Sequence, residues 1–211
     1  MTRALGVARV VFGLDTPIQV AADRAAALGW DHLDITVGAL DSAEEASLAL
    51  PVGDRYSGEV ALPGCTVRTP RRDVAWEDAV AFLRSTPGIR CEPSPFSVLH
   101  SVAATREMCR AVPGLRITLD TGHVAAWGED PVELLDLAGH VQLRQAAPGL
   151  PQLHVDDARG VVDFGRVLRR LDELDFDGLI SVEYFDLPEL GWPLDDPVGY
   201  CVDLAHYVRA L

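Results

Sequence analysis

The feature that most constrains the fold of this chain is a regular alternation of short apolar runs with amphipathic segments. The apolar runs predict strands over residues 7–13, 32–38, 64–70, 88–95, 115–123, 141–146 and 178–185. The segments between them predict helices over 15–30, 71–86, 97–114, 130–140, 163–176 and 195–211. Three of these helices open with Thr or Asp followed by Pro, which is typical of a helix N-terminus. The alternation predicts an α/β fold with a parallel sheet.

The predicted strands are apolar on both faces, which indicates a sheet covered on both sides by helices. No GxGxxG turn follows the first strand, so a (β/α) TIM-type barrel is favoured over an open doubly wound sheet. The polar, Gly-containing segment 51–60 predicts a loop. We therefore expect one domain over residues 1–211, a barrel shortened to about seven strands instead of eight. The resulting seam favours a homodimer.

Composition limits the partners and the chemistry of the chain. The 211 residues carry a formal charge of −14, and all 18 basic residues are Arg. The negative charge predicts that the protein binds neither nucleic acid nor a membrane surface. A small molecule is therefore the expected substrate. The absence of Lys excludes Schiff-base chemistry on a lysine. The cysteines form no CxxC pair and no apolar run is long enough to span a membrane, so a cytoplasmic location is expected.

Polar side chains gather where the predicted strands end, and functional groups of parallel barrels lie at the carboxyl ends of the strands. The residues at these ends are Glu92, Asp120, His123, Gln142, Arg144 and Glu183. Several ionised carboxylates in one place repel one another unless a cation compensates them. The clustering predicts one divalent metal ion, and the mixture of oxygen and imidazole groups suits Mn, Mg, Co or Zn.

Three motifs carry a resemblance to a known family. They are LDTGH at 119–123, HVQLRQAAPG at 140–149, and the run 161–185 that ends in DGLISVEYF. In this order and spacing the chain resembles the sugar phosphate isomerase/epimerase group of the xylose isomerase-like TIM barrel superfamily. The resemblance is clear from Gly88 to the C-terminus.

The resemblance implies a divalent ion held by a Glu, an Asp, a His and a second Glu, with the two Glu acting as acid and base. Glu92, Asp120 and Glu183 match three of these ligands, and His123 matches a His that binds substrate beside the metal. Gln142 stands where the ligating His would be. Either Gln142 is a weaker metal ligand, or His140 or His154 replaces it.

The residues expected to bind substrate are His123, Arg144, His154 and Trp127. Arg144 could hold a phosphate or carboxylate, or form a salt bridge with a neighbouring carboxylate. Trp192, Tyr184 and Phe185 could add a wall for a sugar-like ligand or could be core residues.

The function expected from these residues is a metal-dependent isomerase or epimerase of carbohydrate metabolism, acting on a small hydroxycarbonyl compound. Glu92 and Glu183 would remove and return a proton through an enediolate. One alternative is a dehydratase or lyase that begins with the same deprotonation. Another is a barrel without catalysis that serves in binding or assembly. DNA repair is disfavoured because the early strands end without His.

Overall fold

The computed structural model describes residues 3–38 and 40–211. Eight parallel strands form a closed barrel in the order β1-β10-β7-β6-β5-β4-β3-β2, and β1 pairs with both β10 and β2. The strands are β1 (Gly6–Ala8), β2 (Leu33–Thr36), β3 (Val52–Tyr56), β4 (Thr66–Arg68), β5 (Arg90–Glu92), β6 (Arg116–Asp120), β7 (Ala138–Leu143) and β10 (Leu179–Val182). The expected TIM-type barrel is therefore present.

The expectation of a barrel shortened to seven strands is wrong, because the segment predicted as a loop contains β3. This strand has no apolar alternation: Asp54 at its centre is buried, and the residues around it are partly exposed. Asp54 is stabilised inside the barrel by an ion pair with Arg90 and by a hydrogen bond with His140, which a pattern of apolar residues cannot reveal. The ring closes, so the seam that favoured a homodimer is absent.

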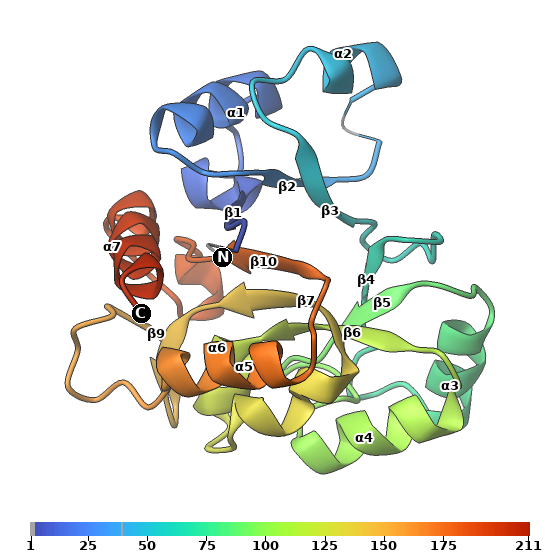
Figure 1. The fold of residues 1–211 in the computed structure, drawn as a ribbon. Coiled ribbons are helices and arrows are strands. Elements are labelled where there is room, and N and C mark those ends of the chain that lie inside the picture. Colours follow the sequence, from blue (N-terminus) through green and yellow to red (C-terminus); the bar gives the residue numbers. More distant parts are fainter. Residues whose placement is uncertain (1–2, 39) are drawn as a thin grey trace.

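Helices surround the ring of strands (Figure 1), with α1 and α2 at one end of the view and α3 and α4 at the other. The α-helices are α1 (Ile18–Ala27), α2 (Ser42–Ala46), α3 (Trp76–Arg84), α4 (Val102–Ala111), α5 (Thr121–Ala126), α6 (Phe164–Glu173) and α7 (Pro197–Arg209). The connection between β3 and β4 contains no helix in residues 57–65. None of the helices in the described residues combines the length and apolar character that a membrane crossing requires.

Several predicted boundaries change in ways that matter for the site. The first predicted strand ends at Ala8 and continues as the 3-10 helix η1 (Arg9–Phe12), and the segment after Asp130 forms the 3-10 helix η2 (Pro131–Leu137). The predicted strand 141–146 divides into the end of β7 and the start of a hairpin. This hairpin comprises β8 (Gln145–Ala147) and β9 (Leu150–Leu153). A third 3-10 helix, η3 (Pro188–Leu190), lies in the loop after β10.

The interior of the barrel contains a buried layer of polar and charged side chains, which we call the interior network. It consists of His32, Asp34, Asp54, Arg90, His140 and Ser181. The imidazole of His140 donates from Nδ1 to Asp54 Oδ2 over 2.9 Å and from Nε2 to Ser181 Oγ over 3.0 Å. Its Nε2 also lies 3.4 Å from Asp34 Oδ2.

Charge compensation is nearly complete within the interior network. Burial alone would lower the pKa of His140, but the charge of Asp34 and hydrogen bonds to Asp34 and Asp54 raise it to about 10. Burial would raise the pKa of Asp54, but His140 and Arg90 lower it to about 2. Both shifts favour an imidazolium between two carboxylates. The layer is therefore a set of ion pairs that stabilises the barrel from inside.

Candidate active site

The carboxyl ends of the strands surround a cavity of about 700 Å³. We call the polar residues at the strand ends the mouth cluster: Glu92, Asp120, His123, Gln142 and Glu183. Four of them line the cavity, and Asp120 is buried directly behind His123. Asp34, Asp54 and His140 of the interior network also line this cavity. Glu92 ends β5, Asp120 ends β6, Gln142 lies one residue before the end of β7, and Glu183 follows β10. The structure thus brings together four strand-end positions and the His of the Asp-x-x-His turn.

Asp120 and His123 are held by the short helix α5, which begins directly after β6. Asp120 caps this helix, because its Oδ1 accepts hydrogen bonds from the backbone N–H of Gly122 (2.7 Å) and of His123 (3.3 Å). The imidazole of His123 then lies with Nε2 3.3 Å from Glu92 Oε1 and 3.6 Å from Asp120 Oδ2. One potential ligand atom from each of these three residues falls within 4.8 Å of the others.

Gln142 completes one side of the mouth cluster. It pairs with Asp120 on β6 and with Ser181 on β10, so its side chain lies between those of the two neighbouring strands. The side chain lines the cavity, yet Oε1 is buried and has no hydrogen-bond partner among the described residues. A buried carbonyl oxygen without a donor is costly, and a cation would satisfy it.

Glu183 has the most strongly perturbed acid–base equilibrium of the cluster. Burial raises its pKa well above the usual value of a glutamate, and the negative charges of Glu92 and Asp120 raise it further. Arg144 acts in the opposite direction and does not cancel this effect. The raised pKa of Glu183 favours its protonated form, which suits the acid of an acid–base pair.

The guanidinium of Arg144 is completely buried and forms an ion pair with Asp120. Of the two alternatives for this residue, the structure shows the salt bridge to a neighbouring carboxylate. The group is covered by the rings of Phe185 and Trp192, with its Cζ 4.7 Å and 5.7 Å from the ring centres. Arg144 does not line the cavity, so it contacts no ligand there in this arrangement.

Two residues expected to bind substrate lie away from the cavity. His154 follows the β8–β9 hairpin and bonds through Nε2 to Asp203 Oδ2 of α7 over 2.9 Å, because the loop runs along the outside of the barrel. Trp127 ends α5 and packs against the hydrophobic core. Neither residue is among those that line the cavity. His140 does line it, but both of its ring nitrogens are hydrogen-bonded, to Asp54 and to Ser181, so neither is open to a metal ion in this arrangement.

The aromatic wall of the cavity comes from two loops. Phe96 follows β5, whereas Phe185 and Trp192 follow β10, and Trp192 contacts Phe96, His123 and Phe185 with ring centres 5.5–5.7 Å apart. Tyr184, also considered for this wall, is fully buried in the core. A flat apolar wall above a polar base suits a ligand with one C–H face and several hydroxyl groups.

Two further residues, Tyr56 and Arg68, line the cavity without being predicted by a sequence pattern. Arg68 Nε donates to the Tyr56 hydroxyl over 3.0 Å. Tyr56 is the last residue of β3, so it was missed together with its strand. The position of each residue at a strand end would have indicated a role, once β3 had been recognised.

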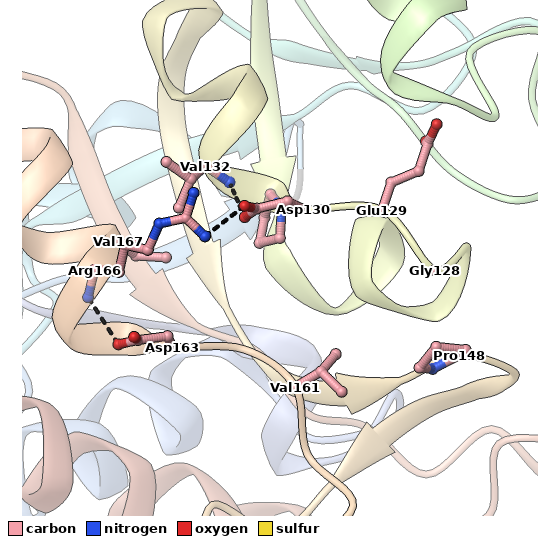
Figure 2. A pocket seen from close by; sticks show the side chains of 10 residues that line it. Gly128, Glu129, Asp130, Val132, Pro148, Val161, Asp163, Arg166 and Val167 are labelled. Atoms are coloured by element: carbon pink, nitrogen blue, oxygen red, sulfur yellow. Dashed lines mark hydrogen bonds and ion pairs between the residues drawn. The ribbon is translucent and has the colours of Figure 1, made fainter.

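A second, smaller cavity of about 300 Å³ lies outside the barrel mouth, where η2, the β8–β9 turn and α6 meet (Figure 2). Arg166 at its edge pairs with Asp130 Oδ2 over 2.5 Å, and Val132 N donates to Asp130 Oδ1 over 3.0 Å. Figure 2 shows Pro148 and Val161 on the side opposite this ion pair. The charged groups are paired with one another, so this cavity has no feature that points to a ligand.

Sequence and structure comparisons place this geometry in a family. A sequence model of the xylose isomerase-like TIM barrel matches residues 75–197 of the 211-residue chain. The chain belongs to this family. No curated protein sequence matches the chain.

Three solved structures illustrate the shared fold at low sequence identity. An L-ribulose 3-epimerase superposes with a TM-score of 0.71 at 15% identity over 100% of this chain and 94% of that one. A probable 3-DHS dehydratase, AsbF from Bacillus anthracis, gives 0.66 at 12% identity, with 99% of each chain covered. The IOLI protein, solved with a bound zinc atom, gives 0.66 at 13% over 99% and 98%. At these identities the likeness establishes the fold.

Proposed function

We propose that this xylose isomerase-like barrel is an isomerase or epimerase that acts on a small, sugar-like hydroxycarbonyl compound. The observation that carries the proposal is the pair of carboxyl groups, Glu92 and Glu183, on one cavity, with the pKa of Glu183 raised by burial. An enzyme that removes a proton beside a carbonyl and returns it needs one group that accepts the proton and one that donates it. The fold shared with an L-ribulose 3-epimerase agrees with this chemistry.

The residues of the mouth cluster also fit a divalent metal ion. Glu92 and Asp120 converge with His123, and Gln142 offers a buried carbonyl oxygen without a partner. Glu92, Asp120, Gln142 and Glu183 would hold the ion, which could be Mn, Mg, Co or Zn. When bound, the ion would polarise the substrate carbonyl and stabilise the negative charge of an enediolate.

The protein's own side chains would transfer the proton and bind the substrate. Glu92 is the first candidate for the base, since its ionised form raises the pKa of Glu183. Glu183 in its protonated form returns a proton on the other side of the substrate carbon. His123 donates from Nε2 toward the hydroxyls of the ligand, and Phe96, Phe185 and Trp192 exclude water from the reacting face.

Proton exchange with solvent tests this proposal. The protein is incubated in D₂O with Mn²⁺ and a panel of ketoses and ketose phosphates, and deuterium beside the carbonyl is measured by NMR. We expect exchange with at least one compound, reduced roughly 10²–10⁴-fold in Glu183→Gln and Glu92→Gln. Glu189→Gln is the matched control, because Glu189 is an exposed carboxylate on the loop after β10.

The outcomes separate the competing functions. Exchange with inversion or carbonyl migration supports an isomerase or epimerase, whereas loss of water from the compound indicates a dehydratase. An unchanged rate in Glu183→Gln removes Glu183 from proton transfer. A wild-type protein that binds a panel compound and exchanges no proton is a binding barrel without catalysis.

A further inference from the structure

Arg144 interacts with Asp120, one of the proposed metal ligands, and with His123 beside it. Its Nη2 forms the ion pair with Asp120 Oδ2 and lies 3.3 Å from His123 Nδ1. The same Oδ2 lies on the side of Asp120 that faces His123 Nε2, while Oδ1 is occupied by backbone N–H groups of α5. The guanidinium therefore uses the one carboxylate oxygen of Asp120 that α5 leaves open.

The local backbone is built to hold Arg144 in this position. The Thr121 hydroxyl donates to the Arg144 carbonyl and accepts from the Arg144 N–H, each over 2.9 Å. Gly122 provides the space, since a Cβ at this residue would lie 2.6 Å from Arg144 Nε. The position of the guanidinium thus follows from β7, from α5 and from the missing side chain at Gly122.

The hydrogen-bonding capacity of this buried guanidinium is only partly used. Among the described residues, neither Nε nor Nη1 of Arg144 has a hydrogen-bond partner. Its compensation therefore comes from Asp120, with the faces of Phe185 and Trp192 above it. A cation held by one carboxylate can be displaced more easily than one held by several, because fewer interactions are lost.

The contact with His123 also determines which ring nitrogen carries the proton. A guanidinium can only donate, so His123 Nδ1 must accept, and the proton of a neutral ring lies on Nε2, toward Glu92. This tautomer agrees with His123 as a donor to the substrate. Arg144 and an ion therefore compete at Asp120, while His123 keeps Nε2–H available in the cavity.

We propose that Arg144 and the divalent ion exclude one another at the mouth cluster, so that the guanidinium is the resident cation and an ion must displace it to bind. This inference rests on the metal site of the proposed function. It explains how Asp120, which is 1% exposed, is compensated when no ion is bound. It also predicts that the strength of ion binding is set by Arg144 more than by the ligand Gln142.

Titration of Mn²⁺ into the purified protein, followed by calorimetry and by the EPR signal of free Mn²⁺, tests the exclusion. We expect Arg144→Met to bind Mn²⁺ at least about tenfold more tightly than wild type at about pH 8, because a like charge close to the ion is removed. Arg71→Met is the matched control. It removes one arginine from the rim of the same cavity, where Arg71 pairs with Asp73. Arg144→Lys keeps the charge and is expected to resemble wild type.

Equal or weaker binding in Arg144→Met, with its thermal unfolding intact, would overturn the exclusion and leave the metal site standing. If no variant binds Mn²⁺, the metal site itself is wrong and the exclusion falls with it. If Arg144→Met binds Mn²⁺ and the wild-type protein does not, the exclusion is supported. The proposed function would then have to operate without a metal ion.

A second measurement does not depend on the stability of the variant. The Nε–H resonance of Arg144 in wild-type protein, assigned by its loss in Arg144→Lys, is expected to shift when Zn²⁺ is added. A resonance that stays in place while one equivalent of Zn²⁺ binds would contradict displacement.

Discussion

On β5, on β7 and at the end of β10, a residue of the interior network lies two positions before a residue of the mouth cluster, yet the two groups differ in how their buried polar atoms are compensated. Arg90 precedes Glu92 on β5, His140 precedes Gln142 on β7, and Ser181 precedes Glu183 at the end of β10. In the lower layer, each carboxylate has a cation or hydroxyl within hydrogen-bonding or ion-pairing distance. In the upper layer Asp120 is paired with Arg144, but Gln142 Oε1 has no partner among the described residues, and burial raises the pKa of Glu183.

The difference shows how one barrel separates structural from chemical use of the same residue types. A compensated buried network stabilises a fold, whereas an uncompensated cluster is costly unless a ligand, a proton or a cation completes it. Two side chains that are two positions apart on one strand therefore belong to different layers and have different roles. The following predictions test this contrast.

The largest expected effect comes from removing the central cation of the interior network. His140→Gln leaves Asp34 and Asp54 without their shared imidazolium, and breaking a buried ion pair in this way costs about 3–5 kcal/mol. Denaturation by urea at about pH 6, where the imidazole is charged in the folded state, measures the loss. Gln142→Met is the matched control on the same strand, and we expect it to change stability by less than about 1 kcal/mol. Equal losses in both variants would remove the distinction between the layers.

The pH dependence of stability should come mainly from the interior network. The folded pKa of His140 is raised from 6.5 to about 10, so its contribution is complete below pH 6.5 and is lost as the pH rises through about 10. The folded pKa of Asp54 is lowered from 3.8 to about 2, so its contribution is complete above pH 3.8 and is lost as the pH falls through about 2. Melting temperatures should therefore be nearly constant between pH 3.8 and pH 6.5, and they should fall at lower and at higher pH. A His140→Gln protein that keeps the full alkaline loss would show that another group causes it.

A smaller effect of opposite sign is expected at the mouth cluster. The folded pKa of Glu183 is raised, so its ionised form destabilises the fold at pH values above the ordinary pKa of glutamate. Glu183→Gln removes this charge and should stabilise the protein by about 0.5–2 kcal/mol at about pH 8. The gain should disappear in acid, where Glu183 is protonated in both the folded and the unfolded protein. If Glu183→Gln instead destabilises the protein at about pH 8, the charge of Glu183 is compensated in the folded protein, as the charges of the interior network are.

The contrast also explains what the sequence could predict. Glu92, Asp120 and Glu183 lie at strand ends that the apolar runs predict, and the structure brings them together with His123. β3 was missed because its stability depends on Arg90 and His140, which are distant in the sequence. His154 was misplaced for a related reason, since nothing before it indicates the β8–β9 hairpin that carries it toward α7. The local pattern of apolar residues predicts helices and strands that have an apolar face of their own. It does not predict a strand such as β3, which is stabilised by ion pairs with residues distant in the sequence.

Arg144 illustrates the limit for side chains. Its place at a strand end is visible in the sequence, and a salt bridge was one of the two roles considered. The direction of its guanidinium depends on the space at Gly122 and on the rings of Phe185 and Trp192, which three-dimensional packing alone determines.

The polar character of β3 has a consequence for how the barrel assembles. Asp54 is anchored by Arg90, 36 residues later, and by His140, 86 residues later, and the strand has few apolar side chains to hold it before those partners arrive. Closing such long loops lowers the conformational entropy of the chain before the ion pairs can form and stabilise the fold. The charge of Asp54 is therefore fully compensated only after β5 and β7 have taken their places in the ring.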